Sequence, residues 1–178
     1  MARVAVIDPK AATGETRQLL AAVESGLGMV PNFIRVLANS PAALGAFLGL
    51  HGIAGNGALD AKTRERIALA IAEKNACEYC VSAHTVIGRK VGLDNDEMLA
   101  NRMGRSADAK AEAALAFARA LVETMGGVTE ADVDTVRRAG HSDAEIVEII
   151  THVAMNIFTN LIGKATSVEI DFPKIPLA

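Results

Sequence analysis

Residues 143–163 read DAEIVEIITHVAMNIFTNLIG, and this stretch decides the fold class. Ser142 and Glu145 have the spacing of a capping box, in which each side chain bonds the other residue's backbone N–H at a helix start. Apolar residues then occupy nearly every side of the expected helix. A helix of this kind is buried in the protein core or against another subunit. The apolar positions are Ile146, Val147, Ile149, Ile150, Val153, Ala154, Ile157, Phe158, Leu161 and Ile162.

The rest of the chain shows the same helical pattern, with apolar residues three or four apart and capping residues or glycines at the segment ends. Only residues 3–7 look strand-like, and strands do not alternate with helices along the chain. We therefore predict an all-α domain of seven to nine helices with an extended C-terminal tail. The other expected helices cover 14–27, 32–39, 41–54, 61–74, 76–91, a short segment capped by Asp94 and ending near Met103, 107–125 and 130–139, and the tail 164–178 contains Pro173 and Pro176.

Composition excludes several classes of protein. The 178 residues are 51% hydrophobic with a net charge of −3, which indicates one folded domain over residues 1–178. A sequence pI of about 5.8 and the lack of a basic run disfavour nucleic-acid binding. No apolar run reaches the roughly 18 residues of a membrane span, and residues 1–9 do not resemble a signal peptide. We therefore expect a cytoplasmic protein that binds no membrane.

Two further features of the composition concern assembly and redox state. The mean hydropathy is +0.26 although only 3% of the residues are aromatic. Such an apolar chain is expected to hide part of its surface in a homo-oligomer. With two cysteines and no secretion signal, a disulfide-stabilised scaffold is not the first interpretation.

Residues 64–84, RERIALAIAEKNACEYCVSAH, carry the chemistry. Asn75 is expected to cap a helix whose third residue is Glu78. Cys77 then lies in the first helical turn and Cys80 one turn later, both near the positive end of the helix dipole, where a thiolate is favoured. His84 follows Cys80 by four residues, so its imidazole shares a face with that sulfur and could accept or return its proton.

Three interpretations of this segment remain open on spacing alone. The cysteines could form a redox-active pair, which we favour, or they could be two small buried core residues. They could also bind zinc with His84, and Glu65 or Glu73 would be the fourth ligand, although structural zinc sites usually have a second Cys/His pair. Because the helix break at Asn75 hides the direction of these carboxylates, the sequence does not decide their role. A thioredoxin-type motif is excluded, since it needs a βαβ context.

A polar stripe crosses the apolar helix 143–163 at His152, Asn156 and Asn160. These residues could form a second wall of an active site, but buried hydrogen bonding between helices or subunits is the favoured interpretation. Tyr79, between the cysteines, could gate access to them or pack in the core. No function is predicted for His51 or His141.

Glu65, Cys77, Cys80 and His84 form the pattern E-x11-C-x-x-C-x-x-x-H, which resembles the AhpD-like alkyl hydroperoxidases of the carboxymuconolactone decarboxylase superfamily. The segments GMVPN at 28–32, Ser40-Pro41 and NIFTN at 156–160 are similar to the peroxidase-related branch of that superfamily. Together these motifs cover a core of about 28–163. The resemblance implies an all-helical fold and an antioxidant peroxidase that reduces hydroperoxides through a Cys77–Cys80 disulfide.

The resemblance also assigns roles within the site. It implies that Cys80 attacks the peroxide, that Cys77 resolves the sulfenic acid and donates a proton, and that Glu65 and His84 relay protons. Position near the helix start instead favours Cys77 as the more acidic thiol. Where well-known members have a relay histidine, this chain has Tyr79, which is no base near neutral pH.

The family further implies a trimer or hexamer with no bound cofactor and no metal, reduced by an external dithiol or a lipoylated protein. Two other functions compete with the peroxidase hypothesis. One is a lyase like carboxymuconolactone decarboxylase, which would not need the cysteine pair. The other is a redox-sensing oligomeric protein without enzymatic activity.

Overall fold

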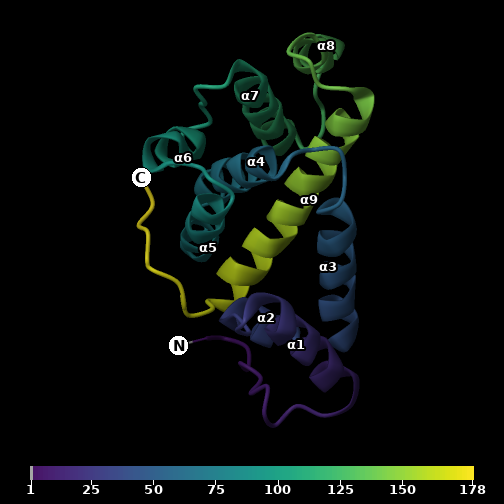
Figure 1. Ribbon diagram of the computed structural model, residues 1–178, viewed down its shortest axis with the longest axis vertical. Coiled ribbons are helices and arrows are strands. Elements are labelled where there is room, and N and C mark those ends of the chain that lie inside the picture. Colours follow the sequence, from purple (N-terminus) through teal and green to yellow (C-terminus); the bar gives the residue numbers. More distant parts are fainter. Residues whose placement is uncertain (1) are drawn as a thin grey trace.

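The computed structural model describes residues 2–178, and within that range the chain forms nine α-helices and no strand (Figure 1). This confirms the predicted all-α class; Met1, the first residue of the predicted domain, lies outside the described residues. The helices are α1 (Gly14–Leu27), α2 (Asn32–Leu37), α3 (Pro41–Ala54), α4 (Ala61–Lys74), α5 (Glu78–Lys90), α6 (Asn95–Arg102), α7 (Ala109–Thr124), α8 (Glu130–Arg138) and α9 (Asp143–Thr166).

Most helix starts lie where the sequence places them, and a local side chain caps several of them, whereas α1 and α2 have no side-chain cap. The hydroxyl of Ser40 accepts a hydrogen bond from the backbone N–H of Ala43, and Pro41 occupies the first position of α3. Ser142 and Glu145 form the expected capping box at the start of α9. The Thr129 box, only approximate in sequence because its third residue is Asp132, is also complete.

Two segments differ from the prediction. Residues 3–7 belong to no strand of the described chain, and Arg3 and Val4 form a bend; the N–H of Arg3 donates to the carbonyl of Thr166, and that of Ile7 to the carbonyl of Arg35. Helix α9 continues past Gly163 to Thr166, so the extended tail begins later than predicted.

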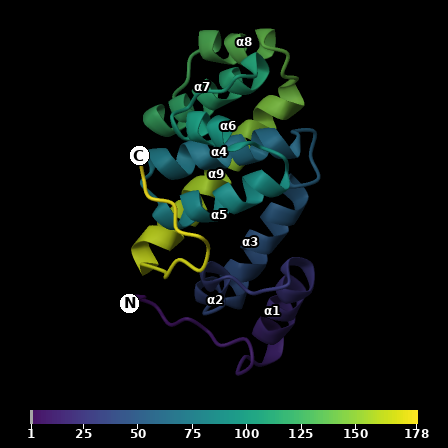
Figure 2. The same ribbon diagram turned by 60° about the vertical axis from the view of Figure 1, so that its left-hand side comes forward.

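Helix α4 is the centre of the molecule, in contact with α5, α6, α7 and α9 (Figures 1 and 2). Its residues Ile67, Leu69 and Ile71 are fully buried. Helix α9 crosses the molecule beside α4 and also contacts α2, α3, α5, α7 and α8. The junction between α4 and α5 is therefore held from several sides, and this junction carries the cysteines.

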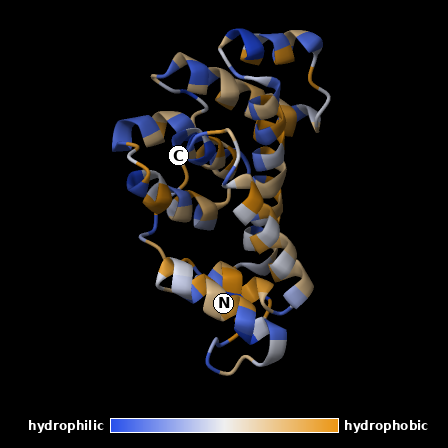
Figure 3. Ribbon diagram, turned by 45° about the vertical axis from the view of Figure 1, so that its right-hand side comes forward, coloured by the Kyte–Doolittle hydropathy of each residue, from blue (hydrophilic) through white to orange (hydrophobic). Residues whose placement is uncertain are grey.

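Helix α9 is long and apolar enough to cross a membrane, so the expectation that no stretch has this length and composition is wrong. Buried core helices meet the same criteria, and α9 contributes Ile149 and Val153 to the core. Its outer side keeps Val147 and Leu161 exposed, and α3 beside it exposes Ile53. Figure 3 shows hydrophobic colours along this side of the molecule, whereas α8 is mainly hydrophilic.

Candidate functional site

The turn between α4 and α5 differs from the predicted one. Asn75 ends α4 instead of capping α5, and Ala76 adopts the left-handed conformation with φ 51°. The N–H of Cys77 donates to the carbonyl of Ala72, and that of Ala76 to the carbonyl of Glu73. This is a Schellman motif, which satisfies two of the free carbonyls at the end of a helix. The motif places Cys77, two residues after the C-cap of α4, directly at the start of α5.

Cys77 itself is the N-cap of α5 instead of a residue of its first turn, and it forms a disulfide with Cys80. The two Cα atoms are 5.3 Å apart, and the sulfur of Cys77 accepts a hydrogen bond from the N–H of Cys80 at 3.4 Å. Both cysteines are buried, with 1% and 4% of their surface exposed. A thiolate on Cys77 would thus lie at the helix N-terminus, where the backbone N–H groups and the dipole stabilise it.

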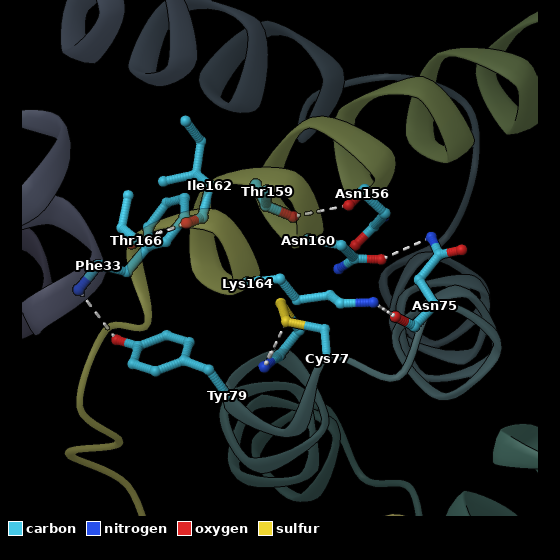
Figure 4. Close-up of a disulfide and its surroundings, with 11 residues drawn as sticks. Phe33, Asn75, Cys77, Tyr79, Asn156, Thr159, Asn160, Ile162, Lys164 and Thr166 are labelled. Atoms are coloured by element: carbon cyan, nitrogen blue, oxygen red, sulfur yellow. Dashed lines mark hydrogen bonds between the residues drawn. A yellow bond between two sulfur atoms is a disulfide. The ribbon is translucent and has the colours of Figure 1, made fainter. Parts of the chain in front are cut away.

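Helix α9 covers the disulfide with one face (Figure 4). A Cβ atom built on Gly163 would lie 3.3 Å from the sulfur of Cys77 and 3.8 Å from that of Cys80, so a side chain at this position would crowd the Cys77 sulfur. One turn earlier, Oδ1 of Asn160 accepts a hydrogen bond from Nδ2 of Asn75 at 2.9 Å. Lys164 extends from the same helix and donates from Nζ to the carbonyl of Asn75 at 2.6 Å.

Glu65 and His84 meet between α4 and α5. Oε2 of Glu65 lies 2.8 Å from Nδ1 of His84, and both side chains are largely buried. His84 is on the same helix as Cys80 and follows it by about one turn. The structure therefore brings the predicted relay residues into contact with each other. Glu73, the alternative zinc ligand, instead accepts from Nε of Arg102 at 2.7 Å, and residues 2–178 contain no group of three metal-ligating side chains.

Tyr79 packs in the core and forms hydrogen bonds that connect α5 with α2 and the C-terminal tail. Its hydroxyl accepts a hydrogen bond from the N–H of Phe33 at 3.2 Å and donates one to Oδ1 of Asp171 at 2.9 Å. Burial raises the pKa of Tyr79 far above its ordinary value, and the nearby Asp171 carboxylate raises it further. The side chain that replaces the family's relay histidine thus joins α5 to α2 and the C-terminal tail.

The polar stripe of α9 is buried, in line with the favoured interpretation, but only part of it is hydrogen-bonded. Nδ2 of Asn156 donates to the carbonyl of His152. In residues 2–178, Nε2 of His152 and Nδ2 of Asn160 have no hydrogen-bond partner. Burial lowers the pKa of His152, so its imidazole is neutral near pH 7.

Three residues that contact this site were missed from the sequence: Gly163, Lys164 and Asp171. Gly163 looked like a helix end, because glycine commonly follows the last helical turn. Lys164 and Asp171 lay in the stretch expected to be an extended tail. The one available signal was the i, i+4 spacing of Asn160 and Lys164, which places both side chains on one face if the helix continues.

Residues 41–123 of the chain match the Carboxymuconolactone decarboxylase family. Two solved structures are similar to almost the whole chain. One is an uncharacterised peroxidase-related protein from Ralstonia eutropha described as an alkylhydroperoxidase AhpD core, with a TM-score of 0.83, 27% identity, and coverage of 96% of this chain and 92% of that one. The other, a peroxidase-related protein from Silicibacter, has a TM-score of 0.80, 26% identity, and coverage of 92% and 90%.

A curated relative is similar over a shorter stretch. The uncharacterised protein 4 in the cox locus of Paracoccus denitrificans is 34% identical over 74 residues, or 41% of this chain. The match spans 66% of that relative's length, and a match to a second relative spans 40% of its length.

Proposed function

The chain belongs to the AhpD-like members of the carboxymuconolactone decarboxylase superfamily, and on that premise we propose that it is a thiol-dependent peroxidase with an antioxidant role. The observation that carries the proposal is the Cys77–Cys80 disulfide at the start of α5, with the Glu65–His84 pair about one turn further along. A cysteine pair at a helix N-terminus can cycle between dithiol and disulfide, and an adjacent carboxylate–imidazole pair can move the protons.

The proposed first step is attack of the Cys80 thiolate on the terminal oxygen of a hydroperoxide. The O–O bond breaks, Cys80 becomes a sulfenic acid, and the alkoxide leaves. Cys77 gives its proton to the alkoxide, which departs as an alcohol. The Cys77 thiolate then attacks the Cys80 sulfur, forming the disulfide and expelling hydroxide. The proton first taken from Cys80 by Glu65 and His84 converts that hydroxide to water.

The order of the two cysteines follows the family pattern. The short distance between His84 and Glu65 supports a role for that pair in removing the Cys80 proton, since a carboxylate can orient and stabilise an imidazolium. Tyr79 takes no part in the relay, because its hydroxyl is bonded to Phe33 and Asp171 and its pKa is raised.

The decisive test is peptide mass spectrometry of the reduced protein after one equivalent of organic hydroperoxide, with free thiols alkylated. We expect a Cys77–Cys80 disulfide in the wild type and no peroxide consumption in Cys80→Ser. In Cys77→Ser, one equivalent should be consumed and a sulfenic acid should be trapped on Cys80 by dimedone. Two free thiols in the wild type after prolonged exposure, or full activity in Cys80→Ser, would remove the peroxidase proposal.

The same variants distinguish the competing functions. A lyase activity of the carboxymuconolactone decarboxylase type would persist when both cysteines are replaced by serine. A redox sensor would form the disulfide once but would not turn over with any reductant.

The remaining parts of the proposal concern assembly and reduction. We propose a cytoplasmic homo-oligomer, a trimer or hexamer, which binds neither nucleic acid nor membranes and needs no bound cofactor or metal. The exposed apolar residues of α3 and α9 support an oligomer, because patches of this kind usually mark contact surfaces. A dithiol, free or on a lipoylated protein, would reduce the disulfide; sedimentation and turnover with lipoamide test the two parts separately.

A further inference from the structure

Asn160 is a buried polar residue that has no role in the proposed peroxidase cycle. It is 2% exposed, and within residues 2–178 its Nδ2 has no hydrogen-bond partner. A buried amide N–H without a partner destabilises a folded protein, so native structures rarely retain one without a reason. The oxygen of the Asn160 carboxamide sets its orientation, since Oδ1 accepts a hydrogen bond from Nδ2 of Asn75.

The free nitrogen belongs to the helix whose face covers the disulfide. Asn160 precedes Gly163 by three residues on α9, and a Cβ atom built on Gly163 would lie 3.3 Å from the Cys77 sulfur. Figure 4 shows the oxygen of Asn160 turned to Asn75 and its nitrogen turned to the side where the disulfide lies. Asn160 and Gly163 therefore share the helix face that covers Cys77.

The oxidation state of the cysteines decides whether this nitrogen can find a partner. A disulfide sulfur carries no charge and is a weak acceptor, so Nδ2 remains unpaired in the oxidised form. A thiolate on Cys77 is an anion, and hydrogen bonds to anions are roughly twice as strong as those between neutral groups. Reduction separates the two sulfurs and frees the Cys77 sulfur to move toward α9.

We propose that Asn160 is a positioning residue that donates a hydrogen bond from Nδ2 to the thiolate of Cys77. The bond holds the resolving thiolate next to α9 and favours the reduced form over the disulfide. In reduction, an external dithiol transfers two electrons, its own sulfurs become bonded, and the Cys77–Cys80 bond breaks. Of the two dithiol protons, one goes to each cysteine, and Cys77 becomes the thiolate that Nδ2 binds when it gives its proton to the alkoxide or when the pH exceeds its pKa.

The inference builds on the proposed peroxidase cycle for its purpose, but its test uses no peroxide. In reduced Cys80→Ser the only thiol is Cys77, whose pKa can be measured from thiolate absorbance against pH. Adding Asn160→Ala should raise that pKa by about one unit, a tenfold loss of thiolate at a given pH. Asn160→Asp should raise it further, because it keeps the acceptor for Asn75 and replaces the donor with a carboxylate.

With both cysteines present, the same substitutions should change the redox equilibrium. In dithiothreitol buffers at a pH above the pKa of Cys77, Asn160→Ala should shift the dithiol–disulfide equilibrium constant about tenfold toward the disulfide, or about 30 mV for two electrons. Asn156→Ala is the matched control, since it removes an amide of the same helix that bonds the His152 carbonyl. It should leave the pKa and the potential unchanged.

Each outcome decides the question. A raised pKa and a lower potential in both Asn160 variants, absent in Asn156→Ala, would support the proposal. Unchanged values in Asn160→Asp, which keeps the bond to Asn75, would overturn it even if Asn160→Ala does not fold. Loss of peroxidase activity alone would not bear on it, and an inactive wild type with the expected pKa shift would reject the peroxidase cycle while keeping this thiolate contact.

Discussion

Two glutamates, one on α4 and one on α6 beside it, differ in how many hydrogen bonds their carboxylates accept. Glu97, on α6, is surrounded by donors: Oε1 accepts from Arg66, Asn101 and Ser106, and Oε2 accepts from the N–H of Ala107. Partial burial alone would raise the pKa of Glu97, but these hydrogen bonds outweigh it and lower the pKa to about 2.

Glu65, on α4, has one side-chain partner among the described residues, Nδ1 of His84. Its carboxylate therefore retains free acceptor positions next to a titratable ring. A carboxylate held by several donors stays ionised and fixes its neighbours, whereas one held by a single imidazole can exchange a proton with it. Several hydrogen bonds thus hold the Glu97 carboxylate, whereas the proposed cycle uses the carboxylate of Glu65, which has one side-chain partner.

The largest effect that tests this difference is expected from Glu65→Gln. The amide keeps a hydrogen bond to His84 but cannot take up a proton, so peroxide turnover should fall about 10- to 100-fold. Because the shape and the contact persist, the free energy of unfolding should change by less than about 0.5 kcal/mol. Steady-state rates and urea unfolding measure the two quantities; a large loss of stability with normal turnover would reverse the assigned role.

The second-largest effect is expected from Glu97→Gln, which should lower the free energy of unfolding and leave the rate of peroxide turnover unchanged. Loss of the carboxylate leaves charged and neutral donors poorly paired, which should destabilise the fold by about 2 kcal/mol at pH 7. Turnover per folded molecule should be unchanged. Reduced turnover at full stability would show that Glu97 also contributes to chemistry.

The stabilisation from Glu97 should also depend on pH in a defined direction. The pKa of Glu97 is about 2 in the folded protein and near its ordinary value of 4.5 when unfolded. The carboxylate therefore stabilises the fold above about pH 4.5, and this contribution is lost as the pH falls toward 2. The difference in unfolding free energy between wild type and Glu97→Gln should shrink over that interval.

The smallest effect is expected from Tyr79→Phe. Removing the hydroxyl leaves the N–H of Phe33 and the carboxylate of Asp171 without this partner, which should destabilise the fold by about 1 kcal/mol. Peroxide turnover should remain within twofold, since Tyr79 behaves like Glu97 and not like Glu65. Thermal unfolding and steady-state rates check both statements, and a tenfold fall in rate would show that Tyr79 takes part in the chemistry.

The sequence predicted most helices because their starts depend on neighbours along the chain, as at Ser40 and Ser142. It did not predict the α4–α5 turn, because Ala76 adopts a left-handed conformation for which glycine is the usual signal. That turn sets the direction of α5 relative to α4, so helical periodicity could not show that Glu65 reaches His84. The cysteine pair could be identified from the sequence, whereas the packing of α9 over the disulfide could not, because it depends on tertiary structure.

Gly163 looked like the end of a helix, yet α9 passes through it without interruption. The absence of a side chain at Gly163 leaves space beside the Cys77 sulfur. Each catalytic cycle would break and remake a bond between two sulfurs, and unbonded sulfurs must separate. A methyl group at position 163 would lie 3.3 Å from the Cys77 sulfur even in the bonded state. Because Gly163 has no side chain, the two sulfurs would be able to separate in the proposed cycle without displacing α9 from the packed core.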